Sequence, residues 1–200
     1  MLGSRPDLAF SINKRAQYSA QPTTRYWLAV KRILRYVKGT INAKLVLGAR
    51  HSQQIPRTLV TGYFDAAFMD NTADRHSSMG YIFLVAGSPV TWASKEQRVG
   101  ALSTTEAEYL AGTEVTKEAM WIHHFLREIG IPKDRILPMS LRGDNQSAIA
   151  LTKNPEYHAR TKHIQAKQRF ISEMVEQGFI TVQYVSTADM IADTLNKALS

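Results

Sequence analysis

The chain has 200 residues, a formal net charge of +8 at pH 7 and no cysteine, and 44% of its residues are hydrophobic. This length suits one ordinary domain, or a smaller domain with an additional segment, and the hydrophobic content is sufficient for a buried core. The composition excludes disulfide frameworks, zinc ribbons and thiol nucleophiles, and neither a signal peptide nor a membrane-spanning run is expected.

Positive charge is concentrated in the first quarter of the chain. Residues 1–57 contain eleven Lys or Arg and a single acid, Asp7, whereas residues 58–200 contain fourteen basic and sixteen acidic residues. This asymmetry is typical of a segment that lies against phosphate. A solvated helix face would have the same composition, so that alternative stays open.

A basic helix is predicted near the N-terminus. Hydrophobic residues recur every three or four positions after Pro22-Thr23-Thr24, up to a typical helix end at Gly39. Four basic residues are interleaved with this apolar stripe: Lys31, Arg32, Arg35 and Lys38. Such a helix would dock on protein with one side and face nucleic acid with the other. The polar stretch from His51 to Pro56 is interpreted as a linker, which divides the chain into residues 1–57 and 58–200.

Strands and helices alternate after this linker. Five strands are predicted, at Thr58–Asp65, Gly80–Ala86, Pro89–Ser94, Met139–Arg142 and Phe179–Val185. Four helices are predicted, at Thr105–Ile129, Asn145–Thr152, Thr161–Glu176 and Ala188–Leu199. Short loops, with a turn at Gly87-Ser88, favour antiparallel pairing of the first three strands, and the helical crossovers favour parallel pairing of the others. The expected fold class is therefore α/β, with a five-stranded mixed sheet and flanking helices.

Four acidic residues fall where they could meet at one end of this sheet. Asp65 and Asp144 each end a strand, Glu108 lies in the first turn of the long helix, and Asp193 lies in the last helix. Two like charges ~4 Å apart cost about 4 kcal/mol at an effective dielectric of 20, so such a cluster needs cations. Mg²⁺ prefers oxygen ligands, and an ion pair ~3.5–4 Å apart assists phosphodiester cleavage. Singly, Asp144 could cap a helix and Glu108 could be a favourable charge near a helix start.

Ordered motifs give the chain a resemblance to a known family. The motifs are Gly62-Tyr63-Phe64-Asp65-Ala66, Trp92-Ala93-Ser94-Lys95, Leu102-Ser103-Thr104-Thr105-Glu106-Ala107-Glu108-Tyr109, Gly143-Asp144-Asn145-Gln146-Ser147-Ala148, Arg160-Thr161-Lys162-His163-Ile164 and Ala192-Asp193. Over residues 58–200 the chain resembles the ribonuclease H domain of Ty1/copia-type retrotransposons. Residues 1–57 resemble the C-terminal, connection-like tail of the preceding reverse transcriptase, and the polymerase Tyr-x-Asp-Asp signature is absent.

The resemblance implies a ribonuclease H-like fold and a two-metal endonuclease. It implies that Asp65 contacts both Mg²⁺ ions, that Asp193 helps hold the ion on the water side, and that Glu108 and Asp144 help hold the ion on the leaving-group side. Mn²⁺ is expected to substitute. Glu106 competes with Glu108 for the helix position, and the motif favours Glu108. The RNA strand of an RNA–DNA hybrid would be cut to leave a 3′-hydroxyl and a 5′-phosphate.

The chain departs from its relatives in two places. Many relatives have Asp-Ala-Asp-Trp where this chain has Asp65-Ala66-Ala67-Phe68, but the missing acid is not one of the four. Cellular relatives have a histidine in the loop before the last helix, where this chain has Ser186-Thr187-Ala188. Activity is expected to survive the first change, and the second puts product release or proton transfer in doubt.

Nucleic-acid contacts are expected outside the acidic cluster as well. Besides the four basic residues of the N-terminal helix, the candidates are Arg75, Ser77, Asn145 and Gln146. The expected partners are an RNA–DNA hybrid and the reverse transcriptase part of the same polyprotein, with no membrane. Cytoplasmic virus-like particles or the nucleus, and not secretion, are the expected location.

Two other functions remain open. A non-catalytic module that binds hybrids and supports a reverse transcriptase would keep the fold without cleavage. An integrase-type nuclease would share the fold, but such enzymes lack the late Asp193 position and place their glutamate after the second aspartate. Here Glu108 precedes Asp144.

Overall fold

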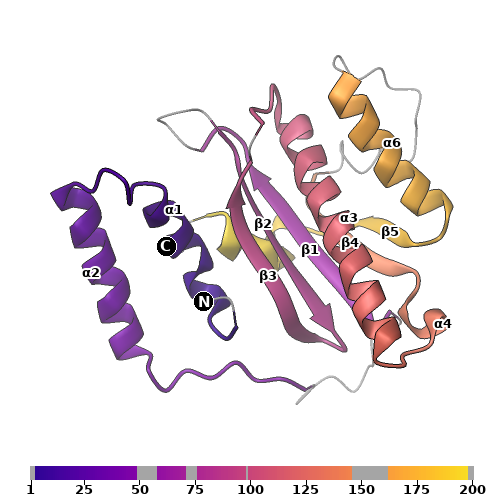
Figure 1. Ribbon diagram of the computed structural model, residues 1–200, viewed down its shortest axis with the longest axis horizontal. Helices are drawn as coiled ribbons and strands as arrows, with labels where there is room; N and C mark the ends of the chain where they lie inside the picture. The colour runs from indigo at the N-terminus through magenta and orange to yellow at the C-terminus, as the bar shows by residue number, and fades with distance from the viewer. Residues whose placement is uncertain (1–2, 49–57, 71–75, 98, 146–161, 198–200) are drawn as a thin grey trace.

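The computed structural model describes residues 3–48, 58–70, 76–97, 99–145 and 162–197. A five-stranded sheet with the order β3-β2-β1-β4-β5 forms its centre (Figure 1). The strands are β1 (Val60–Ala67), β2 (Ser78–Val85), β3 (Ser88–Glu96), β4 (Met139–Gly143) and β5 (Ile180–Tyr184). All five predicted strands are confirmed, with bounds shifted by at most two residues.

The sheet is mixed, as the loop lengths predict. β1, β2 and β3 pair antiparallel, whereas β4 pairs parallel with both β1 and β5. The β2–β3 turn lies at Ala86-Gly87, one residue before the predicted Gly87-Ser88. Both turn residues have positive φ, 49° and 78°, which is the backbone of a two-residue hairpin turn matched to the twist of the strands.

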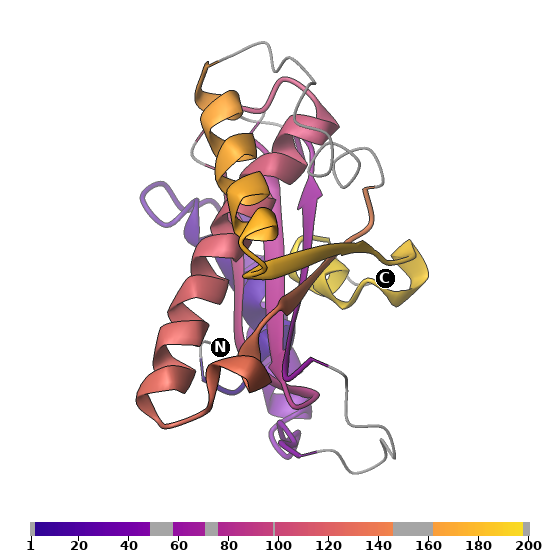
Figure 2. The same ribbon diagram turned by 90° about the vertical axis from the view of Figure 1, so that its right-hand side faces the viewer.

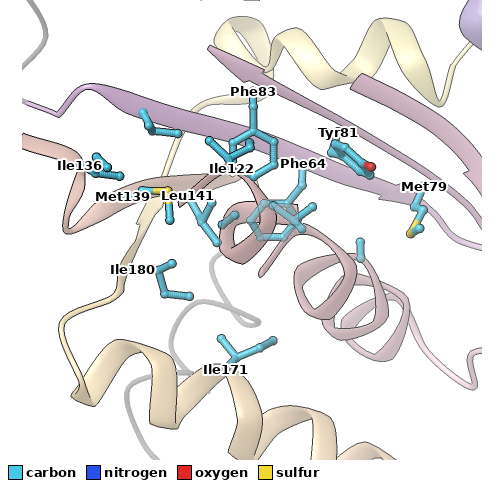
Figure 3. Packing of buried hydrophobic residues seen from close by; sticks show 14 of the residues in the cluster. Phe64, Met79, Tyr81, Phe83, Ile122, Ile136, Met139, Leu141, Ile171 and Ile180 are labelled. Carbon is cyan, nitrogen blue, oxygen red and sulfur yellow. The ribbon is translucent and has the colours of Figure 1, made fainter. Parts of the chain in front are cut away.

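Two long helices cover one face of the sheet. α3 (Thr104–Glu128) and α6 (Lys162–Glu176) pack against each other, and α3 packs on β1 (Figure 2). The core between them and the strands is apolar and includes Phe64, Phe83, Ile122, Leu141, Ile171 and Ile180 (Figure 3). A single turn, α4 (Lys133–Ile136), was not expected from the sequence. Apart from Asn145 itself, the predicted helix Asn145–Thr152 lies outside the described residues.

The other face of β2 and β3 is covered by the two ends of the chain. η1 (Pro6–Leu8) leads into α1 (Ala9–Ala16), which packs on β3 and on η3 (Ile191–Leu195). Buried Ala9, Trp92 and Leu195 meet there, and Asn13 Nδ2 donates to the Ser94 carbonyl oxygen at 2.8 Å. α1 therefore contributes to the packing of the strand domain, although it lies in the segment assigned to the tail of another domain.

The predicted basic helix forms, and it packs on α1 and not on the sheet. α2 (Thr24–Gly39) packs against α1, on the side away from the sheet (Figure 1). None of its residues is buried, and Trp27 and Leu34 are 54% and 58% exposed. One side of the apolar stripe is therefore partly covered, since the Tyr26 ring stacks on Tyr18 with centroids 3.9 Å apart, while Trp27 and Leu34 stay exposed.

The prediction of a continuous last helix at Ala188–Leu199 is wrong over the part that the structure describes, up to Lys197. The chain instead forms two 3₁₀ turns, η2 (Thr187–Asp189) and η3, separated by Met190, whose ψ of 91° is not helical. η3 packs closely on β2, since a Cβ on Gly80 would lie 2.7 Å from Leu195 Cβ and 3.0 Å from the Ala192 oxygen. Across the described residues, no helix is both long enough and apolar enough to cross a membrane.

Candidate active site

Parallel pairing of β1 and β4 places two of the four acids side by side. Tyr63 is in register with Arg142, so Asp65 and Asp144, each two residues further on, reach the same edge of the sheet. Glu108 approaches from the first turns of α3. Carboxylate oxygens of Asp65, Glu108 and Asp144 lie within 4.8 Å of one another. The structure thus brings together three acids that are distant in sequence.

Helix capping separates the roles of Glu106 and Glu108. Ser103 Oγ accepts from the Glu106 N–H at 3.1 Å, and Glu106 Oε2 accepts from the Leu102 N–H at 2.7 Å. This is a capping box, which holds Glu106 at the helix start. Glu108 is buried beside the other acids, and its Oε1 accepts from the Ala66 N–H at 3.1 Å.

Asp193 lies on the other side of Asp65 and is linked to it through a lysine. Lys197 Nζ is 2.8 Å from Asp193 Oδ1 and 3.0 Å from Asp65 Oδ2. The neighbouring Asn196 is buried, and its Nδ2 donates to Asp65 Oδ2 at 2.6 Å. Sequence reasoning did not predict Asn196 or Lys197. The only available indication was the Asp193–Lys197 spacing of four residues, which is common on surface helices.

The environment moves the pKa of each acid. Burial, followed by the charge of Asp65, raises the pKa of Glu108 to about 9. Burial and Asp65 also raise the pKa of Asp144, whose Oδ2 accepts from Thr187 Oγ1 at 3.2 Å. Burial likewise raises the pKa of Asp193, against the hydrogen bond from Lys197. For Asp65 the hydrogen bonds from Asn196, Asp193 and Lys197 outweigh burial, and its pKa is lowered.

The cluster has the properties of a divalent-cation site. Its donors are hard carboxylate oxygens from three distant parts of the chain, the type that Mg²⁺ and Mn²⁺ prefer. Glu108 Oε2 is buried and has no hydrogen-bond partner among the described residues, a costly arrangement unless the group is protonated or bound to a cation. The residues therefore fit a metal ion at the position of Asp65, Glu108 and Asp144.

The candidate nucleic-acid contacts have mixed outcomes. All four basic residues of α2 are exposed, but α2 lies beyond α1 and not next to the acids. The prediction for Ser77 needs correction, because its side chain is fully buried and its Oγ accepts from the Met69 N–H at 3.1 Å. Asn145 lines the same pocket as Glu108. Arg75 and Gln146 lie outside the described residues.

Comparison with known proteins relates the whole chain to part of a longer one. No protein-family model matches the chain. It is 40% identical over 199 residues to the retrovirus-related Pol polyprotein from transposon TNT 1-94 of Nicotiana tabacum, covering 100% of this chain and 14% of that protein. The chain therefore spans about one seventh of that relative's length.

Solved structures with similar folds include a viral and an archaeal protein. The prototype foamy virus protease-reverse transcriptase CSH mutant matches with a TM-score of 0.50 and 16% identity, covering 76% of this chain and 22% of that one. RNase H1 from Halobacterium salinarum NRC-1 matches with a TM-score of 0.47 and 19% identity, covering 68% of this chain and 92% of that one. At these identities the likeness concerns the fold alone.

Proposed function

From its likeness over its whole length to transposon Pol polyproteins we infer that the chain is part of a Ty1/copia-type Pol polyprotein with a ribonuclease H-like fold, and we propose that it is a metal-dependent endoribonuclease acting on RNA–DNA hybrids. One observation carries the proposal: Asp65, Glu108 and Asp144 converge within 4.8 Å at one edge of the sheet. Three carboxylates so close together are unfavourable without cations and well suited to holding them.

The four acids have distinct positions around this edge. Asp65 is central, between Glu108 and Asp144 on one side and Asp193 on the other, so it is placed to contact two cations. Glu108 and Asp144 would hold the cation on the leaving-group side, and Asp193 the one on the water side. Two Mg²⁺ ions, when bound, supply an activated water and stabilise charge on the phosphodiester oxygens, and Mn²⁺ would substitute. The products would carry a 3′-hydroxyl and a 5′-phosphate.

The proposed substrate and setting are based on the chain's relatives. A Pol polyprotein copies RNA into DNA, so the RNA–DNA hybrid is the substrate class that fits a ribonuclease within it. The exposed basic residues of α2 would bind phosphates of the same hybrid, and the reverse transcriptase part of the polyprotein would be the covalent partner. Cytoplasmic virus-like particles or the nucleus are the proposed location.

Hydrolysis of a labelled hybrid tests the proposal. The 200-residue chain should cut the RNA strand in Mg²⁺ and not in EDTA, and Asp65→Asn should remove cleavage while the circular dichroism spectrum stays unchanged. Asp134→Asn is the matched control, because Asp134 is an exposed acid on α4. Hybrid binding without cleavage by the unmodified chain would contradict the proposal and favour the non-catalytic hybrid-binding module.

A further inference from the structure

A lysine amine lies between two of the acids. Lys197 Nζ is 3.0 Å from Asp65 Oδ2 and 2.8 Å from Asp193 Oδ1, so one positive charge bridges two carboxylates. The Asp65 side chain is only 4% exposed, whereas that of Lys197 is 45% exposed. The ammonium therefore reaches a buried carboxylate while its own alkyl chain stays partly in solvent.

The turn that carries Lys197 is fixed in place. Asn196 Nδ2 donates to the same Asp65 Oδ2 at 2.6 Å, so the side chains of two adjacent residues contact one oxygen. Leu195, one residue earlier, is buried against Trp92 and Ala9. The position of the ammonium is thus set by the packing of η3 on the sheet.

The position between Asp65 and Asp193 is one that a cation would occupy. A bridging ammonium reduces the repulsion of the acidic cluster when no metal is bound. It also places a positive charge where a divalent cation would have to enter. Because the Lys197 side chain is nearly half exposed, it has room to move outward when a stronger cation arrives.

We propose that Lys197 is an internal counter-ion that bridges Asp65 and Asp193 in the metal-free chain, and that a divalent cation binding between these two carboxylates displaces it. The inference rests on the proposed function, since it assumes the second cation proposed there, the one held by Asp65 and Asp193. Lys197 stabilises the metal-free protein and lowers its affinity for the ion held by Asp65 and Asp193. It is a positioning residue, because it acts through the carboxylates.

An ordinary surface ion pair would behave differently. A Lys and an acidic residue three or four residues apart on a helix surface form a weak, solvent-screened ion pair, which is expected to have no effect on metal binding. Lys117 is such a case, since its Nζ is 2.7 Å from Glu114 Oε1 on α3 and its side chain is 59% exposed. Lys117→Met is therefore the matched control for Lys197→Met.

Calorimetric titration with Mn²⁺, without nucleic acid, measures the competition directly. Lys197→Met should bind Mn²⁺ roughly tenfold more tightly than the unmodified chain, because a like charge no longer opposes entry. Lys197→Arg, which keeps the charge, and Lys117→Met should bind as the unmodified chain does. In EDTA, Lys197→Met should have the lowest melting temperature of these proteins. In Mn²⁺ its melting temperature should equal or exceed that of the unmodified chain.

The outcomes separate this inference from the proposed function. Equal Mn²⁺ affinities in the unmodified chain and Lys197→Met would overturn the inference alone. No Mn²⁺ binding in either chain would overturn the proposed function and the inference with it. A measurement on the unmodified chain covers the case in which the variant does not fold: the Lys197 ammonium resonance of ¹⁵N-lysine-labelled protein should be protected in EDTA and lose that protection in Mg²⁺. A resonance that Mg²⁺ leaves unchanged would overturn the inference.

Discussion

Replacing Glu108 by Gln should change how the stability of the metal-free protein depends on pH. Burial and the neighbouring Asp65 raise the pKa of Glu108 from 4.5 to about 9. A carboxyl whose pKa is raised on folding binds its proton more tightly in the folded state, so its stabilising effect is complete below 4.5 and is lost as pH rises through 9. Gln cannot ionise, and it can still accept from the Ala66 N–H and fill the same space.

The magnitude follows from the difference of one bound proton. Between pH 6 and 8 the unmodified chain should lose about 1.4 kcal/mol per pH unit relative to Glu108→Gln, about 3 kcal/mol in all. For a chain of this size each kcal/mol shifts Tm by about 2–4 °C, so the two melting curves should diverge by about 6–11 °C.

Thermal melts in EDTA at pH 6, 7 and 8 measure the divergence. Glu106→Gln is the control, because Glu106 lies on the same helix turn but caps the helix start and is not part of the acidic cluster. Its Tm should be lower by a constant amount at every pH. Parallel pH dependence of the unmodified chain and Glu108→Gln would refute the reasoning, because Glu108 would then be ionised within the folded protein.

Two further predictions concern the basic helix and the C-terminal turn. In the first, Lys31, Arg32, Arg35 and Lys38 are all changed to Gln. The slope of log affinity for hybrid against log salt concentration should fall by about 3, because up to four phosphate contacts are lost. An unchanged slope would mean that α2 does not contact the hybrid. Gly80→Ala should cost about 1–3 kcal/mol and weaken Mn²⁺ binding, because the new Cβ meets the backbone of η3, which carries Asp193. Gly100→Ala, where a Cβ meets nothing within 4 Å, should leave both unchanged, and equal melting temperatures for the two variants would contradict the packing of η3 on β2.

The sheet could be predicted because its determinants are local. Strand-length apolar runs, short loops and helical crossovers were sufficient for the number and pairing directions of the strands, whereas the adjacency of the strands that end at Asp65 and Asp144 was only a condition of the predicted site. The choice between Glu106 and Glu108 was also readable, since Ser103 and Glu106 have the spacing of a capping box. That spacing assigns Glu106 to the helix end and leaves Glu108 for the cluster.

The remainder depended on long-range packing that a single sequence does not show. α1 has only eight residues, too few for a clear periodic pattern, and its place on β3 depends on burial of Ala9 against Trp92. The final turn has helical spacing of apolar residues, yet the chain there forms 3₁₀ segments separated by Met190 and packed closely against Gly80. Lys197 resembles any surface lysine until Asp65, 132 positions earlier, is placed beside it.

The packing of α1 against β3 determines where a shorter recombinant fragment of this protein can begin. A recombinant fragment starting at residue 58 would retain all four acids of the candidate active site. It would expose the faces of Trp92 and Leu195 that α1 covers, and it would lose the ion pair of 2.7 Å between Lys14 and Asp70. Poor solubility or inactivity of such a fragment would result from the loss of α1 and would say nothing about the catalytic groups. A fragment that begins at Arg5 keeps α1 packed on β3.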